Sequence, residues 1–240
     1  MPGMQSNASQ LIPILAKCDC LLFDFDGTLA PNLDLPDMRK QVIVMCNAYQ
    51  VPDAVYSGLY IVEVIEAAKK HLASKDPEQA EEFSQNAHQL IRSIELKEAS
   101  KTNPFTWAED LLVSLRSRSI KLGVVTRNCR EAVLCVFPQL QEYVDCLIAR
   151  DDTRYLKPDI RHLKTALEKM GTNSEKSAMI GDGALSIKPL KKKIFITFLN
   201  LFKITSKLIW HATDLNEKND ILKHFGKNSC VRLASNLSSI

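Results

Sequence analysis

Two aspartates one residue apart, Asp24 and Asp26, follow an apolar run and precede Gly27 and Thr28 in the segment LLFDFDGTLA. Successive strand residues alternate between faces, so both carboxylates can point the same way while the neighbouring phenylalanines enter the core. Glycine at position 27 permits a sharp exit of the chain that leaves both carboxylates open to a ligand. These two acids are therefore candidates for acid–base, nucleophilic or metal-binding chemistry.

Polar residues also follow the other predicted strands of the chain. Thr126 follows the second strand, Lys157 lies in the loop beyond the third, and Asp182 follows the fourth. In an open parallel sheet, ligands bind outside the carboxyl ends of the strands, so these side chains are expected to converge. Converging carboxylates repel one another unless a cation neutralises them, and oxygen ligands of this kind favour Mg²⁺. With a hydroxyl and an ammonium group beside the cation, the site suits a phosphoryl group.

The hydrophobic pattern predicts the elements that position these residues. Strands are expected at 20–26, 120–126, 144–149 and 177–182, and helices at 107–119, 130–137 and 160–170. Thr106 and Glu109 form a capping-box pattern at the start of the first of these helices. Strands that alternate with helices indicate an open, mostly parallel sheet, so the predicted fold class is α/β with a Rossmann-like core.

Between the first two strands lies a segment with helical patterns and no strand. Apolar residues recur at helical spacing over 38–49, at Val55, Leu59 and Val62, and over 83–94. Asp76 is expected as the N-cap of the last of these helices, with Pro77 at its first position. Three successive helices predict a separate helical unit at 33–104, inserted into a discontinuous core formed by 1–32 and 105–240.

Composition narrows the class of protein further. A chain of 240 residues with 45% hydrophobic residues can form a substantial core, and a net charge of +3 does not indicate nucleic-acid binding. Seven cysteines, mostly in apolar stretches, together with the absence of a signal-peptide pattern predict reduced thiols and a cytoplasmic location. The histidines lack metal-ligand spacing and are expected at the surface or in core packing: His71, His88, His162, His211 and His224.

The motifs DFDGT (24–28), VVTRN (124–128), KPD (157–159) and MIGDG (179–183), in this order, resemble those of the haloacid dehalogenase-like hydrolase superfamily. The helical insertion lies where one branch, including phosphoglycolate phosphatase-like and β-phosphoglucomutase-like proteins, carries its cap. The resemblance implies a Mg²⁺-dependent phosphatase acting on a small phosphorylated metabolite, with phosphoglycolate as the leading candidate. A phosphomutase acting on a sugar phosphate is the alternative, whereas true dehalogenases lack the double-aspartate pattern.

The resemblance also implies roles for individual residues. Asp24 would be the nucleophile that forms an aspartyl-phosphate, and Asp26 would protonate the leaving oxygen and later activate water. Thr126 and Lys157 would bind the phosphoryl oxygens, with Lys157 also offsetting negative charge. The Asp24 side chain, the Asp26 backbone carbonyl and Asp182 would hold Mg²⁺. Further candidates for substrate binding are Gly27, Thr28, Arg127 and Asn128.

The C-terminal part departs from the family pattern. Ser186 occupies the position of a second acid that supports the metal, so an impaired or non-catalytic member is a further alternative. The sequence at 188–192 is what codons for Glu-Thr-Ala-Lys-Lys would give if read one base out of frame, which suggests that 187–240 is a frameshifted tail. The apolar run at 194–210 is interrupted by polar residues and too short to span a membrane, so a strand followed by an amphipathic helix is expected, with association with a membrane surface as the alternative.

Overall fold

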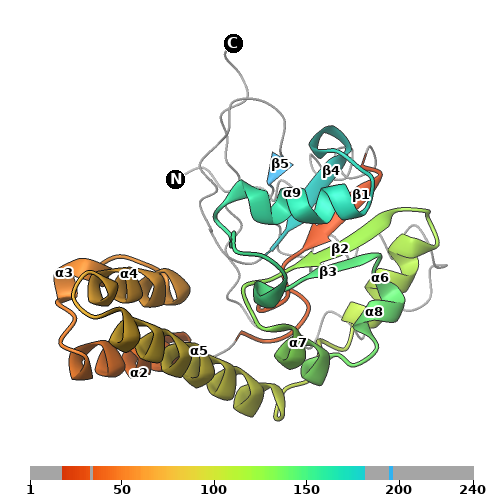
Figure 1. The fold of residues 1–240 in the computed structure, drawn as a ribbon. Helices are drawn as coiled ribbons and strands as arrows, with labels where there is room; N and C mark the ends of the chain where they lie inside the picture. Colours follow the sequence, from red (N-terminus) through yellow and green to blue (C-terminus); the bar gives the residue numbers. More distant parts are fainter. Residues whose placement is uncertain (1–17, 33–34, 182–194, 197–240) are drawn as a thin grey trace, which may run out of the picture. The chain divides into compact units, whose positions relative to one another are not determined.

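The chain divides into two compact units in the computed structural model, which describes residues 18–32, 35–181 and 195–196. The first unit comprises Met1–Pro31 and Asn103–Ile240, and the second comprises Asn32–Thr102 (Figure 1). Predicted features at Asp182, at Ser186 and in the tail lie outside the described residues, apart from one short strand. Across the described ranges, no helix combines the length and apolar character needed to cross a membrane.

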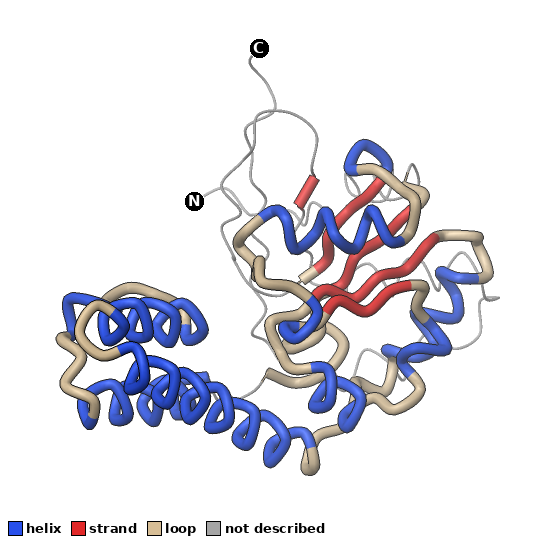
Figure 2. The backbone as a smooth tube through the Cα atoms, in the orientation of Figure 1, coloured by secondary structure: helices blue, strands red, loops and turns tan. Residues whose placement is uncertain are grey.

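The first unit is built on a parallel sheet with β1 (Cys20–Phe23) at its centre. β2 (Lys121–Val125) pairs with one edge of β1, and β4 (Ser177–Ile180) pairs with the other. β3 (Cys146–Ile148) extends the sheet beyond β2, and β5 (Phe195–Ile196) extends it beyond β4 (Figure 2). The order β3-β2-β1-β4-β5, parallel throughout, confirms the predicted α/β core.

The end of β1 differs from the prediction. The strand ends at Phe23, so Asp24 and Asp26 lie in the loop that follows it rather than within the strand. Phe25 is nevertheless fully buried, as is Phe23, which confirms that both phenylalanines enter the core. The two carboxylates are thus positioned by a loop whose middle residue anchors it to the core.

The helices of the first unit are α6 (Ala108–Arg116), α7 (Arg130–Val136), α8 (Leu140–Tyr143) and α9 (Ile160–Lys169). Buried residues of α9 pack in one hydrophobic cluster with residues of β1, β2, β3 and β4, so α9 covers one face of the sheet. Gly123 in β2 lies beneath this contact, and a Cβ there would come within 2.7 Å of Leu22 Cδ2 and 2.9 Å of Met170 Cε. The absent side chain permits the close approach of helix and sheet.

The capping box predicted for α6 is wrong. The N-cap is Trp107 rather than Thr106, and no side chain caps the helix. Trp107 already has a right-handed helical backbone, with φ −90° and ψ −7°, so the chain enters the helix from a turn. A capping box needs an extended N-cap residue whose side chain accepts from the N3 amide, and Trp107 provides neither.

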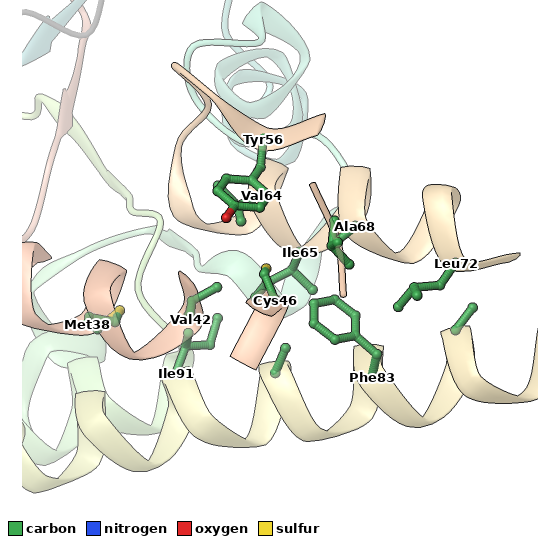
Figure 3. Packing of buried hydrophobic residues seen from close by; sticks show 13 residues of the cluster. Met38, Val42, Cys46, Tyr56, Val64, Ile65, Ala68, Leu72, Phe83 and Ile91 are labelled. Atoms are coloured by element: carbon green, nitrogen blue, oxygen red, sulfur yellow. The ribbon is translucent and has the colours of Figure 1, made fainter. Parts of the chain in front are cut away.

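The second unit consists of four helices in the described residues: α2 (Leu35–Ala48), α3 (Asp53–Tyr56), α4 (Ile61–Ala73) and α5 (Pro77–Ala99). Their apolar faces enclose a buried cluster that includes Cys46, Ile65, Phe83 and Ile91 (Figure 3). Asp76 caps α5 as predicted, because its Oδ1 accepts from the amides of Glu78 and Gln79, both at 3.0 Å. The unit thus has a core of its own.

One predicted helix of this unit is divided. The pattern through Val55, Leu59 and Val62 predicts one helix, but the chain breaks it into α3 and α4. Gly58 lies between them with φ +74°, a left-handed conformation that ends α3, and Leu59 is exposed in the turn. The apolar residues keep helical spacing across this turn although no single helix spans them. Gly58 is the residue in the sequence that could have indicated the turn.

Candidate active site

The loop after β1 is a tight turn that begins as an extension of the sheet. The Asp24 amide donates to the Ile180 carbonyl at 2.8 Å, and the Phe25 carbonyl accepts from the amides of Thr28, Leu29 and Ala30. Gly27 has φ +72°, the left-handed conformation in which glycine carries no steric cost, which confirms the sharp exit expected there. The turn lies at the carboxyl end of the central strand, where the strand order reverses direction in an open sheet.

Asp24 forms an ion pair with a buried lysine. Lys157 Nζ lies 2.6 Å from Asp24 Oδ1, and the side chains are 2% and 14% exposed. The Phe25 amide donates to the same oxygen at 2.8 Å, whereas Asp24 Oδ2 has no partner among the described residues. Burial of an ammonium group is costly without a counter-charge, so the pair fixes Asp24 in one orientation and leaves one oxygen for a ligand.

Asp26 is held by the loop that follows β2. Thr126 Oγ1 donates to Asp26 Oδ2 at 3.3 Å, and Asn128 Nδ2 donates to Asp26 Oδ1 at 3.1 Å. The Asn128 amide in turn donates to Thr126 Oγ1 at 3.1 Å, and both Thr126 and Asn128 are buried. Each oxygen of the second carboxylate therefore has a side-chain donor from the adjacent strand end.

The structure places the remaining predicted site residues around these carboxylates in different ways. Arg127 Nη1 donates to the Lys157 carbonyl oxygen, and Arg150 Nη1 donates to the Arg127 carbonyl at 3.2 Å. Thr28 is buried in the turn after Gly27. Asp182 lies outside the described residues. Contacts of Arg127, Gly27, Thr28 and Asn128 with a substrate stay predictions.

The described part of the site fits a hard cation in donor type. Asp24 and Asp26 offer carboxylate and carbonyl oxygens within one short turn, and neither sulfur nor imidazole groups stand among these donors. Within residues 18–32, 35–181 and 195–196, no three His, Cys, Asp or Glu side chains gather as a possible metal cluster. Asp182, the third predicted ligand, lies outside the described residues, so the magnesium site stays a prediction.

His162 contacts the site from α9, although the sequence indicated only a surface or packing residue. It is fully buried, and its Nδ1 accepts a hydrogen bond from the Lys157 amide at 3.0 Å. Burial, with the nearby Lys157 ammonium as a smaller cause, lowers the pKa of His162 to about 4. One signal was available in the sequence, since His162 adjoins Leu163 on the apolar face of the helix predicted from Ile160.

The first unit is a parallel α/β sheet with two acids in the loop after its central strand, and residues 21–194 match the family model described as haloacid dehalogenase-like hydrolase. The chain belongs to this family of enzymes, which confirms the resemblance seen in the motifs.

Among curated proteins, the pyrophosphatase PpaX of Halalkalibacterium halodurans is 27% identical over 181 residues, covering 71% of this chain and 78% of that protein. Among solved structures, a predicted phosphoglycolate phosphatase from Haemophilus somnus has a TM-score of 0.47 at 16% identity, covering 69% of this chain and 77% of its own. A hydrolase of the same superfamily from Ehrlichia chaffeensis has a TM-score of 0.48 at 19% identity, covering 82% and 98% of the two chains.

Proposed function

We propose that this protein is a Mg²⁺-dependent phosphatase that hydrolyses a small phosphorylated metabolite through an aspartyl-phosphate on Asp24. The ion pair between Asp24 and the buried Lys157 carries the proposal, because it leaves one carboxylate oxygen free beside a fixed positive charge. Membership of the hydrolase family supports it. The name of a similar curated protein, a pyrophosphatase, supports a phosphorylated substrate.

The proposed first step is transfer of the phosphoryl group to Asp24. A carboxylate oxygen of Asp24 forms a bond to phosphorus while the bond from phosphorus to the leaving oxygen breaks. Asp26, in its protonated form, donates its proton to that leaving oxygen, so the alcohol product departs neutral. Lys157 would contact the phosphoryl oxygens and offset the charge that develops on them, and Thr126 would donate its hydroxyl proton to one of them in place of its hydrogen bond to Asp26.

In the proposed second step, water releases the phosphate. Asp26, now a carboxylate, accepts a proton from a water molecule, whose oxygen forms the new bond to phosphorus. The bond between Asp24 and phosphorus breaks, which restores the Asp24 carboxylate and releases inorganic phosphate. The hydrogen bonds from Thr126 and Asn128 support this role, because they fix the orientation of the Asp26 carboxylate in the same short loop as the nucleophile Asp24.

Asp24, the Asp26 backbone carbonyl and Asp182 are the residues proposed to hold Mg²⁺. When bound, the cation supplies positive charge to the phosphoryl oxygens. Serine in place of an acid at position 186 is expected to lower metal affinity, by about 10- to 100-fold if that position supports the metal as in the family. We further propose that the helical unit acts as the substrate-selecting cap and that the protein is cytoplasmic.

Hydrolysis of para-nitrophenyl phosphate, followed by inorganic phosphate release with and without Mg²⁺, tests the proposal. We expect turnover in the wild type, loss of turnover in Asp24→Asn or with a chelator, and unchanged turnover in Asp110→Asn, an exposed acid of α6. Equal activity of Asp24→Asn and the wild type would contradict the nucleophile assignment. Thermal unfolding of Asp24→Asn belongs in the experiment, because this variant leaves the Lys157 ammonium buried without its counter-charge.

The same assay, run on a panel of substrates, addresses the class of metabolite. Phosphoglycolate and inorganic pyrophosphate are the first compounds to include, and sugar phosphates test the alternative reaction. Release of inorganic phosphate supports a phosphatase, whereas an isomerised sugar phosphate without phosphate release would identify a phosphomutase. Phosphorylated Asp24, detected by peptide mass spectrometry after acid quenching, would support the covalent step.

A further inference from the structure

Both polar backbone groups of Lys157 are bound by side chains from other parts of the chain. The amide of Lys157 donates to Nδ1 of His162 on α9 at 3.0 Å. The carbonyl of Lys157 accepts from Nη1 of Arg127, in the loop after β2. Together with the ion pair to Asp24 at 2.6 Å, these contacts hold the lysine at its backbone and at the end of its side chain.

We propose that His162 and Arg127 are positioning residues that set where the Lys157 ammonium stands relative to Asp24, an inference that rests on the proposed phosphatase function. Neither residue is assigned contact with the reacting atoms in this role. They act through the backbone of Lys157, which lies in a loop rather than in a helix or strand. A loop backbone lacks a regular hydrogen-bond ladder, so its position depends on side-chain contacts of this kind.

The imidazole of His162 is suited to accept this hydrogen bond at neutral pH. Its side chain is fully buried, and burial lowers its pKa to about 4, so the ring stays neutral. Because the Lys157 amide donates to Nδ1, the proton of the neutral ring is assigned to Nε2. A buried backbone amide requires an acceptor, which an aliphatic residue of similar size would not supply. Packing alone therefore does not explain a histidine at this position.

Arg127 links the lysine to the loop that holds the second aspartate. Its neighbours on both sides, Thr126 and Asn128, donate to the two carboxylate oxygens of Asp26. A single tripeptide thus contacts Asp26 through two side chains and Lys157 through the third. The positions of the lysine and of the second carboxylate are coupled through residues 126–128, which is the arrangement that aligned attack and proton transfer require.

The test compares His162→Leu with His162→Asn. Leucine removes the acceptor, whereas the carboxamide oxygen of asparagine can take the place of Nδ1 for the Lys157 amide. With para-nitrophenyl phosphate and Mg²⁺, we expect kcat to fall on the order of 10- to 100-fold in His162→Leu and to be largely restored in His162→Asn. Arg127→Met is expected to lower kcat in the same direction, through the carbonyl contact.

Leu163→Ala is the matched control, because it loses buried packing on the same helix while its aliphatic side chain offers no hydrogen bond to the Lys157 backbone. It should lower the unfolding temperature but leave kcat unchanged well below that temperature. Wild-type kcat in both His162→Leu and Arg127→Met would overturn the inference. An equal loss of kcat in Leu163→Ala and His162→Leu would also overturn it, because both losses would then follow stability.

Acetylation of Lys157 by acetic anhydride gives a readout that needs no turnover, with exposed Lys164 of α9 as the internal reference. The buried ammonium of Lys157 should react slowly in the wild type and in His162→Asn, and faster in His162→Leu. An inactive wild type with this acetylation pattern would contradict the phosphatase proposal while supporting the positioning contact. Equal acetylation of Lys157 in all three proteins would contradict the contact itself.

Discussion

Acidification should destabilise the fold through His162. The unfolded imidazole has a pKa near 6.5. Burial, with the Lys157 ammonium as a smaller cause, lowers the pKa of the folded group to about 4. Arg127 acts in the same direction, whereas a hydrogen bond to the Ile148 backbone and the charge of Asp152 oppose the shift. As pH falls below 6.5, His162 binds a proton in the unfolded chain but not in the folded chain. The free energy of unfolding therefore decreases progressively until pH approaches 4. At about 1.4 kcal/mol per pH unit, this loss is about 3 kcal/mol in total and about 2 kcal/mol by pH 5.

Urea denaturation of the wild type and His162→Asn, followed by circular dichroism between about pH 7.5 and about pH 5, measures this loss. Other titrating groups contribute to both proteins, so the prediction concerns the difference between the two profiles. The wild type should lose about 2 kcal/mol more than His162→Asn over this range. Val113→Ala, which changes an exposed aliphatic residue of α6, should follow the wild-type profile. Parallel profiles for the wild type and His162→Asn would refute the argument from burial.

Two further predictions concern the helical unit, and both are measured by urea denaturation. Asp76→Ala removes the side chain that accepts from two amides at the start of α5, so we expect the free energy of unfolding to fall by about 1 kcal/mol. Asp76→Asn keeps an oxygen that can accept these hydrogen bonds, so its free energy of unfolding should stay close to that of the wild type. Phe83→Ala removes a fully buried ring that packs edge-on against the Tyr49 ring, with 5.2 Å between the ring centroids. We expect the free energy of unfolding to fall by about 3 to 5 kcal/mol. A loss below about 1 kcal/mol for Phe83→Ala would contradict the packing described for this core.

The sheet was predictable because its strands are continuous apolar runs that end in polar residues. A strand buried on both faces leaves a clear pattern in the sequence, and the strand ends then bring Asp24, Asp26, Thr126 and Lys157 to one edge. This convergence needs only the topology, which explains why the sequence could predict the described part of the candidate site before any geometry was known.

The features that were not predicted depend on local backbone conformation. The break at Gly58 is hidden because apolar spacing continues across it, and the start of α6 depends on the conformation of Trp107. The contact of His162 depends on the path of the loop that brings the Lys157 amide to α9. The spacing of apolar residues predicts which face of α9 is buried, but it does not predict that the Lys157 amide contacts that face.

The central place of β1 in the sheet has a consequence for how the protein folds. Cys20 of β1 pairs with Lys121 on one side and with Ser177 on the other, which are roughly 100 and 160 residues further along the chain. During synthesis, the strand that precedes both aspartates therefore emerges first, yet neither of its neighbours exists until much later. Its four buried apolar residues stay without strand partners while the helical unit is synthesised, so we expect a chaperone that binds apolar segments to act on this strand at that stage.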